Sequence, residues 1–263
     1  MSPTNHYAHI DYRKVIAWPK RLAREWAFLE RPFGALPSRR LLDLGCGTGE
    51  HARFFASHGF EVVGVDVSDT MLERAREDGV PAGVEFLKGD LVHVEKVVSG
   101  KFGGAICLGN TLTHITDRAA LTELFTDVRA VLLPGAAFVI QVLNYERLLH
   151  TAQRSLPLTF IEDEEGEAIF LRVMTCRPDG SVIFTPSMLR YRPDSEPALE
   201  VITTHNVPLH GWTRTEMESA LTAGGFGTLD VHGTMADVPY DAHESSDLVI
   251  VAHAPAVTPA QAW

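Results

Sequence analysis

The hydrophobic positions in the first half of the chain form short apolar runs, and stretches with helical periodicity separate them. The apolar runs occupy residues 41–45, 61–67, 84–90, 104–110 and 136–144, and the helical stretches occupy residues 49–59, 68–79 and 117–132. Short buried strands that alternate with helices predict βαβ units and a mostly parallel sheet. The first half is therefore expected to be a layered α/β structure.

The pattern changes after residue 150. Three strand-like segments follow, at residues 167–176, 181–191 and 199–209, and the sequences RPDG and RPDSEP separate them. Pro, Asp and Gly supply the backbone geometry of tight turns, so these segments predict an antiparallel meander. The acidic run 162–167 is expected to be a solvated loop or hairpin tip.

The last part of the chain returns to the first pattern. Residues 213–225 have helical character, with Thr213 or Thr215 as the N-terminal cap and a Gly-Gly pair as the stop. Residues 226–233 and 246–254 predict two final strands. The meander is therefore an insertion that precedes the last helix and strands of the α/β part.

Together the segments predict an α/β fold in which a Rossmann-like, seven-stranded, mostly parallel sheet is flanked by helices. The antiparallel β-meander is expected after the fifth strand. The expected organisation is an amino-terminal helical segment or lid at 1–38, the Rossmann-like domain at 39–150 and 211–254, the insertion at 151–210, and a fraying tail at 255–263.

Composition narrows the class of protein. The chain has 263 residues, 45% of them hydrophobic, and a formal net charge of −11. This charge disfavours nucleic acid as a partner. The one basic segment that could bind it, residues 20–40, mixes acidic with basic positions and is typical of a solvated amphipathic helix. No apolar run reaches the roughly 18 to 20 residues that span a bilayer, and the start has no apolar signal core. We therefore expect a cytoplasmic protein without a membrane partner.

The cysteines carry little chemistry of their own. The chain has three, at Cys46, Cys107 and Cys176, and no two are close in sequence. An odd number without close pairs is typical of reduced thiols. Neither a disulfide nor a metal site is expected.

The stretch RRLLDLGCGTGEHARFF, residues 39–55, runs from an apolar strand into a glycine-rich turn and then into a helix. Gly45, Gly47 and Gly49 let the backbone approach a ligand where a Cβ atom would collide. A dinucleotide-binding turn has its third glycine where this chain has Glu50, and an acidic side chain at a helix N-terminus opposes a pyrophosphate. The turn therefore predicts a cofactor site but disfavours a dehydrogenase.

Two acidic residues end the next two strands. Asp66 lies nineteen residues after Gly47, where it would either accept hydrogen bonds from both ribose hydroxyls or cap the following helix. Asp90 ends the third strand, where it would either accept a hydrogen bond from an adenine amino group or act as a cap. These positions favour a ligand that contains adenosine.

Four motifs in this order, LLDLGCGTGEHA, GVDVSDTML, KGDL and AICLGNTLTHI, resemble the successive motifs of class I S-adenosylmethionine-dependent methyltransferases over residues 39–145. Within that superfamily, ICLGNTLTHI, QVLNYERLL and the antiparallel insertion are similar to glycine N-methyltransferase and its glycine/sarcosine relatives. The resemblance implies an open sheet with an antiparallel final strand. It also implies S-adenosyl-L-methionine as cofactor and S-adenosyl-L-homocysteine as product.

The resemblance implies roles for individual positions. The methionine part of the cofactor would be flanked by Gly45, Cys46 and Gly47, and its ribose and adenine by Asp66 and Val67. The face of the adenine would contact Met71, and its edge would contact Asp90 and Leu91. Other parts of the cofactor would contact Leu108 and His114. Arg21 would bind the cofactor's carboxylate, for which a guanidinium is better suited than a lysine. Tyr12, with Tyr7 and Trp18, is either part of an aromatic lid or packs against the first helix.

The methyl acceptor is expected to be a small molecule. Asn110 and Asn144 would either hold the acceptor through their amides or stabilise local turns, and Tyr145 would close the wall of the site. His205 points either to solvent or into the cleft. In-line methyl transfer requires alignment and exclusion of water rather than a nucleophilic side chain, so His114 is a candidate only for accepting the acceptor's proton.

Three functions remain open at this point. The leading one is N-methylation of a small-molecule amine; the alternatives are O-methylation of a metabolite and a non-catalytic cofactor-binding subunit. The insertion is expected to roof the cleft, with its apolar face inward and its alternate residues in water. The alternative role for the insertion is a sheet through which a homo-oligomer forms.

Overall fold

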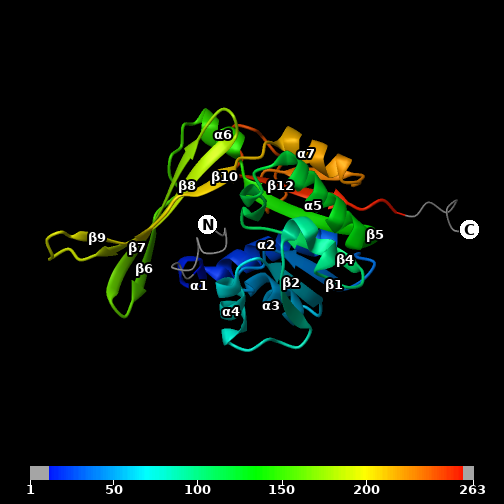
Figure 1. The fold of residues 1–263 in the computed structure, drawn as a ribbon, viewed down its shortest axis with the longest axis horizontal. Coiled ribbons are helices and arrows are strands. Elements are labelled where there is room, and N and C mark those ends of the chain that lie inside the picture. Colours follow the sequence, from blue (N-terminus) through cyan, green and yellow to red (C-terminus); the bar gives the residue numbers. More distant parts are fainter. Residues whose placement is uncertain (1–11, 257–263) are drawn as a thin grey trace, which may run out of the picture.

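The computed structural model describes residues 12–256, in which two sheets are joined to layers of helices. Figure 1 shows the main sheet between helices and the second sheet extending from it as a yellow-green arm. The main sheet has seven strands in the order β11-β12-β5-β4-β1-β2-β3. Its strands are β1 (Arg40–Leu44), β2 (Glu61–Asp66), β3 (Val84–Lys88), β4 (Phe102–Cys107), β5 (Leu132–Leu143), β11 (Leu229–His232) and β12 (Asp247–His253).

The main sheet is parallel except at one side. Strands β1 to β5 pair in parallel, whereas β12 is antiparallel to β5 and to β11. The predicted Rossmann-like sheet with an antiparallel final strand is thereby confirmed. The strand order reverses between β1 and β4, and such a switch point opens a crevice at the carboxyl ends of the strands.

Helices cover both faces of the sheet. They are α1 (Tyr12–Val15), α2 (Trp18–Phe33), α3 (Glu50–Ser57), α4 (Asp69–Glu77), α5 (Arg118–Val131), α6 (Tyr145–His150) and α7 (Arg214–Ala223), with 3₁₀ helices η2 (Leu91–Lys96) and η3 (Thr111–His114). Leu41 packs in a cluster with residues of α2 and α3, whereas the adjacent Leu42 packs with residues of α5 and α7. Because successive strand residues point to opposite faces, the apolar run of β1 fills both cores.

The insertion forms a five-stranded antiparallel sheet rather than the three strands predicted. Its strands are β6 (Thr159–Asp163), β7 (Gly166–Cys176), β8 (Ser181–Tyr191), β9 (Leu199–Thr204) and β10 (Val207–His210). Strand β6 was missing from the prediction, and the predicted third strand is divided into β9, which pairs with the end of β8, and β10, which pairs with its start. The acidic run 162–167 contains the tight turn between β6 and β7, as predicted for a hairpin tip.

The amino-terminal helices connect the two sheets. Val15 of α1 packs against Phe170 of β7, while α2 packs against α3 beside the main sheet. Tyr12 contacts the Phe170 ring edge-on at 6.0 Å. Tyr7 and the last part of the predicted tail lie outside the described residues. Within residues 12–256, no helix is both long enough and apolar enough to cross a bilayer.

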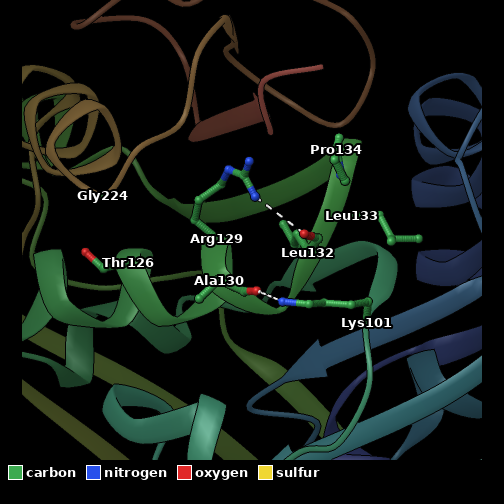
Figure 2. Close-up of a pocket in the computed structure, with 8 residues that line it drawn as sticks. All are labelled: Lys101, Thr126, Arg129, Ala130, Leu132, Leu133, Pro134 and Gly224. Atoms are coloured by element: carbon green, nitrogen blue, oxygen red, sulfur yellow. Dashed lines mark hydrogen bonds between the residues drawn. The ribbon is translucent and has the colours of Figure 1, made fainter. Parts of the chain in front are cut away.

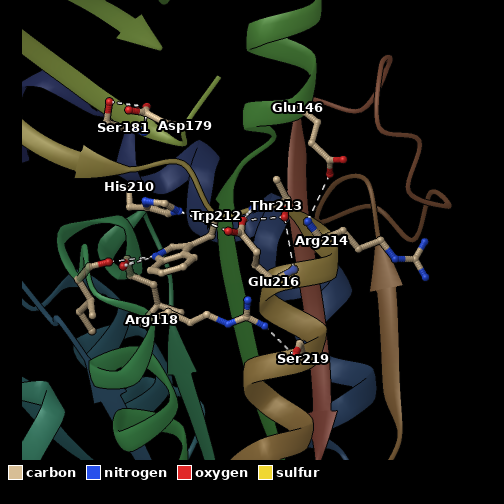
Figure 3. Close-up of polar contacts among 12 residues, drawn as sticks. Arg118, Glu146, Asp179, Ser181, His210, Trp212, Thr213, Arg214, Glu216 and Ser219 are labelled. Carbon is tan, nitrogen blue, oxygen red and sulfur yellow. Dashed lines mark hydrogen bonds and ion pairs between the residues drawn. The ribbon is translucent and has the colours of Figure 1, made fainter. Parts of the chain in front are cut away.

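The chain returns from the arm to the main domain through Trp212 and α7 (Figure 3). Trp212 is 1% exposed, and its Nε1–H donates to the carbonyls of Leu112 at 3.2 Å and Ile115 at 3.1 Å. Helix α7 then begins with the predicted cap, because Thr213 and Glu216 form a reciprocal capping box. Through its two indole hydrogen bonds, Trp212 fixes the position of η3, the segment that follows β4.

Replacement of Trp212 should show how much its indole hydrogen bonds contribute to the free energy of unfolding. We expect Trp212→Phe to lower the free energy of unfolding by about 1–3 kcal/mol, because it leaves two carbonyls without their indole donor. Trp26→Phe is the matched control, since Trp26 makes ring contacts and has no indole hydrogen bond within the described residues. Urea unfolding of both variants measures the difference, and equal losses would contradict the anchoring role.

Candidate active site

The glycine-rich turn between β1 and α3 lies at the carboxyl edge of the sheet, next to the switch point. Gly45 has φ +71°, and a Cβ atom there would lie 2.4 Å from the Thr111 side chain. Gly47 also has positive φ, but among residues 12–256, apart from its two chain neighbours, no atom lies within 4 Å of the place its Cβ would occupy. Cys46 between them packs into the core. The backbone at Gly47 therefore borders open space, as a turn that receives a ligand requires.

Asp66 holds this turn against the end of β2. Its Oδ2 accepts the N–H of Gly47 at 2.9 Å, and its Oδ1 accepts the N–H of Ser68 at 2.9 Å. Burial raises the pKa of this carboxyl, although the N–H groups of Ser68, Gly47 and Val67 act in the opposite direction. The cap of α4 is Ser68, whose hydroxyl accepts from the Met71 N–H. A carboxylate has about four acceptor positions, so Asp66 keeps capacity to accept a ribose hydroxyl.

Asp43, at the end of β1, is a second buried carboxyl beside the turn. It is 3% exposed, and no hydrogen bond reaches its Oδ2 within the described residues. Burial raises its pKa to about 6; His51 lowers the pKa, while Asp66 and Glu50 raise it further. A buried carboxyl without a donor is stabilised by a cationic group placed next to it. The amino group of the expected cofactor fits this requirement.

Glu25 joins α2 to α3 behind the turn. It is 4% exposed, accepts from Arg21 Nε at 2.7 Å and lies 2.7 Å from His51 Nε2. Burial alone would raise the pKa of Glu25, but the bond from His51 and the charge of Arg21 hold it below its usual value. Arg21 Nη2 lies 3.6 Å from the position of a Cβ on Gly109, next to the buried Leu108. Arg21 therefore reaches the carboxyl end of β4.

The residues expected around adenosine lie at the ends of β2 and β3. Val67 exposes 42% of its surface, Met71 is buried in the first turn of α4, and Leu91 is half-buried at the start of η2. Asp90 is exposed, and its Oδ1 accepts the Val92 N–H at 3.0 Å, so it caps η2. The contact of Asp90 with adenine stays a prediction.

Asn110 organises the segment after β4. It has φ +70°; its amide donates to the hydroxyls of Thr113 and Tyr145, and its Oδ1 accepts the N–H of Leu143. One lone pair of Oδ1 remains for a ligand. His114 is exposed at the end of η3. Of the residues expected near the acceptor, Asn110 and His114 remain candidates.

For Asn144, the structure favours the second of the two expected roles, the stabilisation of local turns. It is 1% exposed. Its amide donates to the carbonyls of Asp241, Ala242 and Ser245, and its Oδ1 accepts from the Arg147 N–H and the Tyr240 hydroxyl. All of these partners belong to the protein. Asn144 therefore ties α6 to the segment before β12.

Tyr145 and His205 differ from the prediction. Tyr145 is 1% exposed, its ring lies against Gly211, and burial raises its pKa to about 12, so it is a core residue at the root of the arm rather than an exposed wall. His205 is half-buried in the link between β9 and β10, not within a strand. Tyr12 packs on the arm, and burial raises the pKa of its hydroxyl.

Arg172 of β7 is a cation on the side of the arm that faces α1. Its Nη2 donates to the Pro157 carbonyl at 2.9 Å, its guanidinium lies 5.3 Å from the Phe170 ring centre, and its Nε has no hydrogen-bond partner within the described residues. Burial lowers its pKa. None of its contacts with the described residues is to a carboxylate. A half-buried cation in this state favours an anionic ligand.

A separate hollow of about 550 Å³ lies at the opposite edge of the main sheet (Figure 2). It is open and mostly apolar, and Arg129 and Lys101 at its rim donate to the carbonyls of Leu132 and Ala130. Strands β4 and β5 begin beside it. It is therefore at the end of the sheet away from the glycine turn and is not the candidate site.

Known proteins share parts of this sequence and this fold. Residues 41–135 match a family described as a methyltransferase domain. The chain is 28% identical over 175 residues to a glycine/sarcosine/dimethylglycine N-methyltransferase from Actinopolyspora halophila, covering 63% of this chain and 31% of that protein. It is 34% identical over 129 residues to the glycine N-methyltransferase of Mus musculus, covering 43% of each. The chain therefore spans less than half the length of these two relatives.

One solved structure covers nearly the whole chain. The CcbJ methyltransferase from Streptomyces caelestis has a TM-score of 0.72 and 23% identity, covering 97% of this chain and 100% of that one. At this identity the likeness concerns the fold alone.

Asp43 should make stability depend on pH. Its pKa is about 6 in the folded protein against 3.8 for an ordinary aspartate, so the folded state binds more protons between these values. Wild type should therefore lose about 3 kcal/mol relative to Asp43→Asn as the pH rises from about 4 to about 7. Urea unfolding of both proteins at the two pH values measures this gap. If the difference in unfolding free energy between the two proteins does not change with pH, Asp43 is not held in an apolar environment.

Proposed function

Because the chain belongs to the class I S-adenosylmethionine-dependent methyltransferases, we propose that it transfers a methyl group to the nitrogen of a small amine that also carries a carboxylate. The proposed acceptor rests on Arg172, a half-buried guanidinium whose contacts within the described residues include no carboxylate. The choice of cofactor is supported by the open backbone at Gly47, which lies between the buried Asp43 and the half-buried Asp66.

The cofactor would lie across the carboxyl ends of β1, β2 and β4. Asp66 would accept the ribose hydroxyls while it still holds the turn through Gly47. The buried Oδ2 of Asp43 would stabilise the amino group of the methionine part. Val67 and Met71 would contact the adenine faces, and Asp90 and Leu91 its edge.

Arg21 would bind the carboxylate of the cofactor. Glu25 engages only the Nε of Arg21, so the two terminal amino groups are left for a bidentate contact. Glu25 is in turn held by His51, which lies in the helix that follows the glycine turn. The three side chains therefore position Arg21 relative to the turn.

The acceptor would bind between η3 and the arm. Relatives are named for glycine and sarcosine, amines that carry a carboxylate, and a cation such as Arg172 can pair with that group. Asn110 has one acceptor position left to orient the amine. These contacts would place nitrogen at one end of the acceptor and its anionic group at the other.

S-adenosylmethionine supplies a methyl group that is already electrophilic, so the protein's task is alignment. Holding two reactants in line contributes on the order of 7–11 kcal/mol to lowering a barrier. The arm and the amino-terminal helices border the cleft and would exclude water from it. His114 would take the proton that the amine must lose before or during the transfer.

The homo-oligomer expected through the insertion also remains a proposal.

Arg21 should discriminate between ligands by their carboxylate. We expect Arg21→Gln to weaken S-adenosylmethionine binding about 10- to 100-fold, the range for a lost hydrogen bond to a charged group. Adenosine has no carboxylate, so its affinity should stay within about twofold of wild type. Arg24→Gln, an exposed change on the same helix, is the control. Calorimetric titrations that show equal weakening of both ligands would rule out the carboxylate contact.

Arg172 should determine acceptor binding. In an assay with labelled S-adenosylmethionine, amino acids with primary or secondary amines should accept methyl groups, and the corresponding amines without a carboxylate should be poor acceptors. Arg172→Gln should lower kcat/KM for the amino acids about 10- to 100-fold and leave cofactor affinity unchanged. The exposed Arg192→Gln serves as the control variant. If the variant discriminates between the two kinds of amine as wild type does, Arg172 does not bind the acceptor.

A further inference from the structure

The arm sheet has two faces of unequal exposure. On the inner face, Phe170 and Met174 of β7 and Val182 of β8 are at most 2% exposed and pack with residues of α1 and α6. The opposite face, which we call the outer face, carries the alternate residues of the same strands. They are half-exposed along most of β7 and β8.

The alternate residues, which were expected to lie in water, include many apolar side chains. One row across four strands consists of Phe160, Ile169, Leu189 and Val201, each opposite the next in the strand register. Other apolar side chains on this face are Leu171, Val173, Ile183, Tyr191 and Leu199. Within residues 12–256, none of these nine side chains belongs to a hydrophobic core cluster.

The exposure of this row is greatest at its two ends. Phe160 is 59% exposed and Val201 is 58% exposed, and both belong to strands at the sides of the sheet. Leu199, in the neighbouring row, is 49% exposed. A contiguous apolar sheet face of this kind is typical of an interaction surface.

Charged side chains lie at both ends of the outer face. At the tip, Glu162 lies directly opposite Glu167, an arrangement of like charges that destabilises a sheet unless a cation is near. At the root, Arg177 follows β7 and donates to the Ser181 hydroxyl, and Arg154 donates to the Thr175 hydroxyl. The tip therefore carries the Glu162–Glu167 pair beside the Arg192–Glu200 ion pair, and the root carries two arginines beside Asp179.

We propose that two copies of this chain form a dimer by packing outer face against outer face about a two-fold axis, with the arms antiparallel. Two-fold symmetry places the tip of one arm at the root of the other, so the Glu162–Glu167 pair meets arginines of the second copy. Two aligned sheets with apolar inner faces pack about 10 Å apart. The pattern of this face is thus complementary to itself.

The size of the face is sufficient for such a dimer. Strands β7 and β8 each have 11 residues. At ~3.3 Å per residue and ~4.8 Å between strands, four strands present roughly 500–650 Å² per copy. The pair would bury roughly 1,000–1,300 Å², at the lower limit of specific interfaces.

Sedimentation velocity of the full chain tests this proposal without any cofactor or acceptor, so its outcome is independent of the proposed activity. Wild type should sediment as a dimer at micromolar concentration, and Leu189→Glu, at the centre of the apolar row, should sediment as a monomer. Val80→Glu, an equal change at an exposed site on the main domain, should remain dimeric. A monomeric wild type, or a Leu189→Glu protein that stays dimeric, would overturn the proposal.

A charge exchange tests the antiparallel register. Arg177→Glu and Glu162→Arg should each weaken the dimer. Both changes in one chain should restore it, because the two charges that face each other across the interface are then exchanged and again opposite in sign. S-adenosylmethionine affinity equal to wild type serves as the check that each variant is folded. Failure of the double variant to recover dimerisation would overturn the antiparallel arrangement.

Discussion

The hydrogen bond between the Gly47 N–H and the Asp66 carboxylate fixes the glycine turn to the end of β2, and the geometry of the candidate site depends on it. The N–H groups of Gly45 and Cys46 both donate to the Val65 carbonyl and fix the same turn from its other side. The buried Asp43 and the half-buried Asp66 therefore lie beside a stretch of backbone that no other described residue covers. Such a site is stabilised by a ligand that brings hydroxyl donors and a positive charge.

The amino-terminal helices connect this turn with the arm. Glu25 and His51 hold α2 against the helix that follows the turn, while Val15 of α1 packs against Phe170 in the arm. The amino-terminal helices thus contact both the helix after the glycine turn and the arm, so a change in the position of α1 or α2 would affect both. The exposed pair of Arg13 with Glu77 adds little to this connection, because surface ion pairs contribute at most about 1 kcal/mol.

The main sheet and the turn could be predicted from the sequence because both depend on local patterns: apolar runs of strand length, helical periodicity and glycine spacing. The role of Asn144 could not, since its amide binds carbonyls about a hundred residues away that no local pattern identifies. The contact between Glu25 and His51 also depends on tertiary packing. Strand β6 is short and ends in the acidic run, so its sequence TFIED lacks a clear strand pattern. The apolar outer face becomes evident only when the register aligns Phe160, Ile169 and Leu189 across three strands.

We infer that S-adenosylmethionine binds at the switch point of the sheet, on the turn that Asp66 holds. A crystal structure with S-adenosylhomocysteine would show this binding site. We expect the ribose hydroxyls within hydrogen-bonding distance of the Asp66 carboxylate and the homocysteine part over Gly47. A ligand bound elsewhere, or one whose ribose has no contact with Asp66, would contradict it.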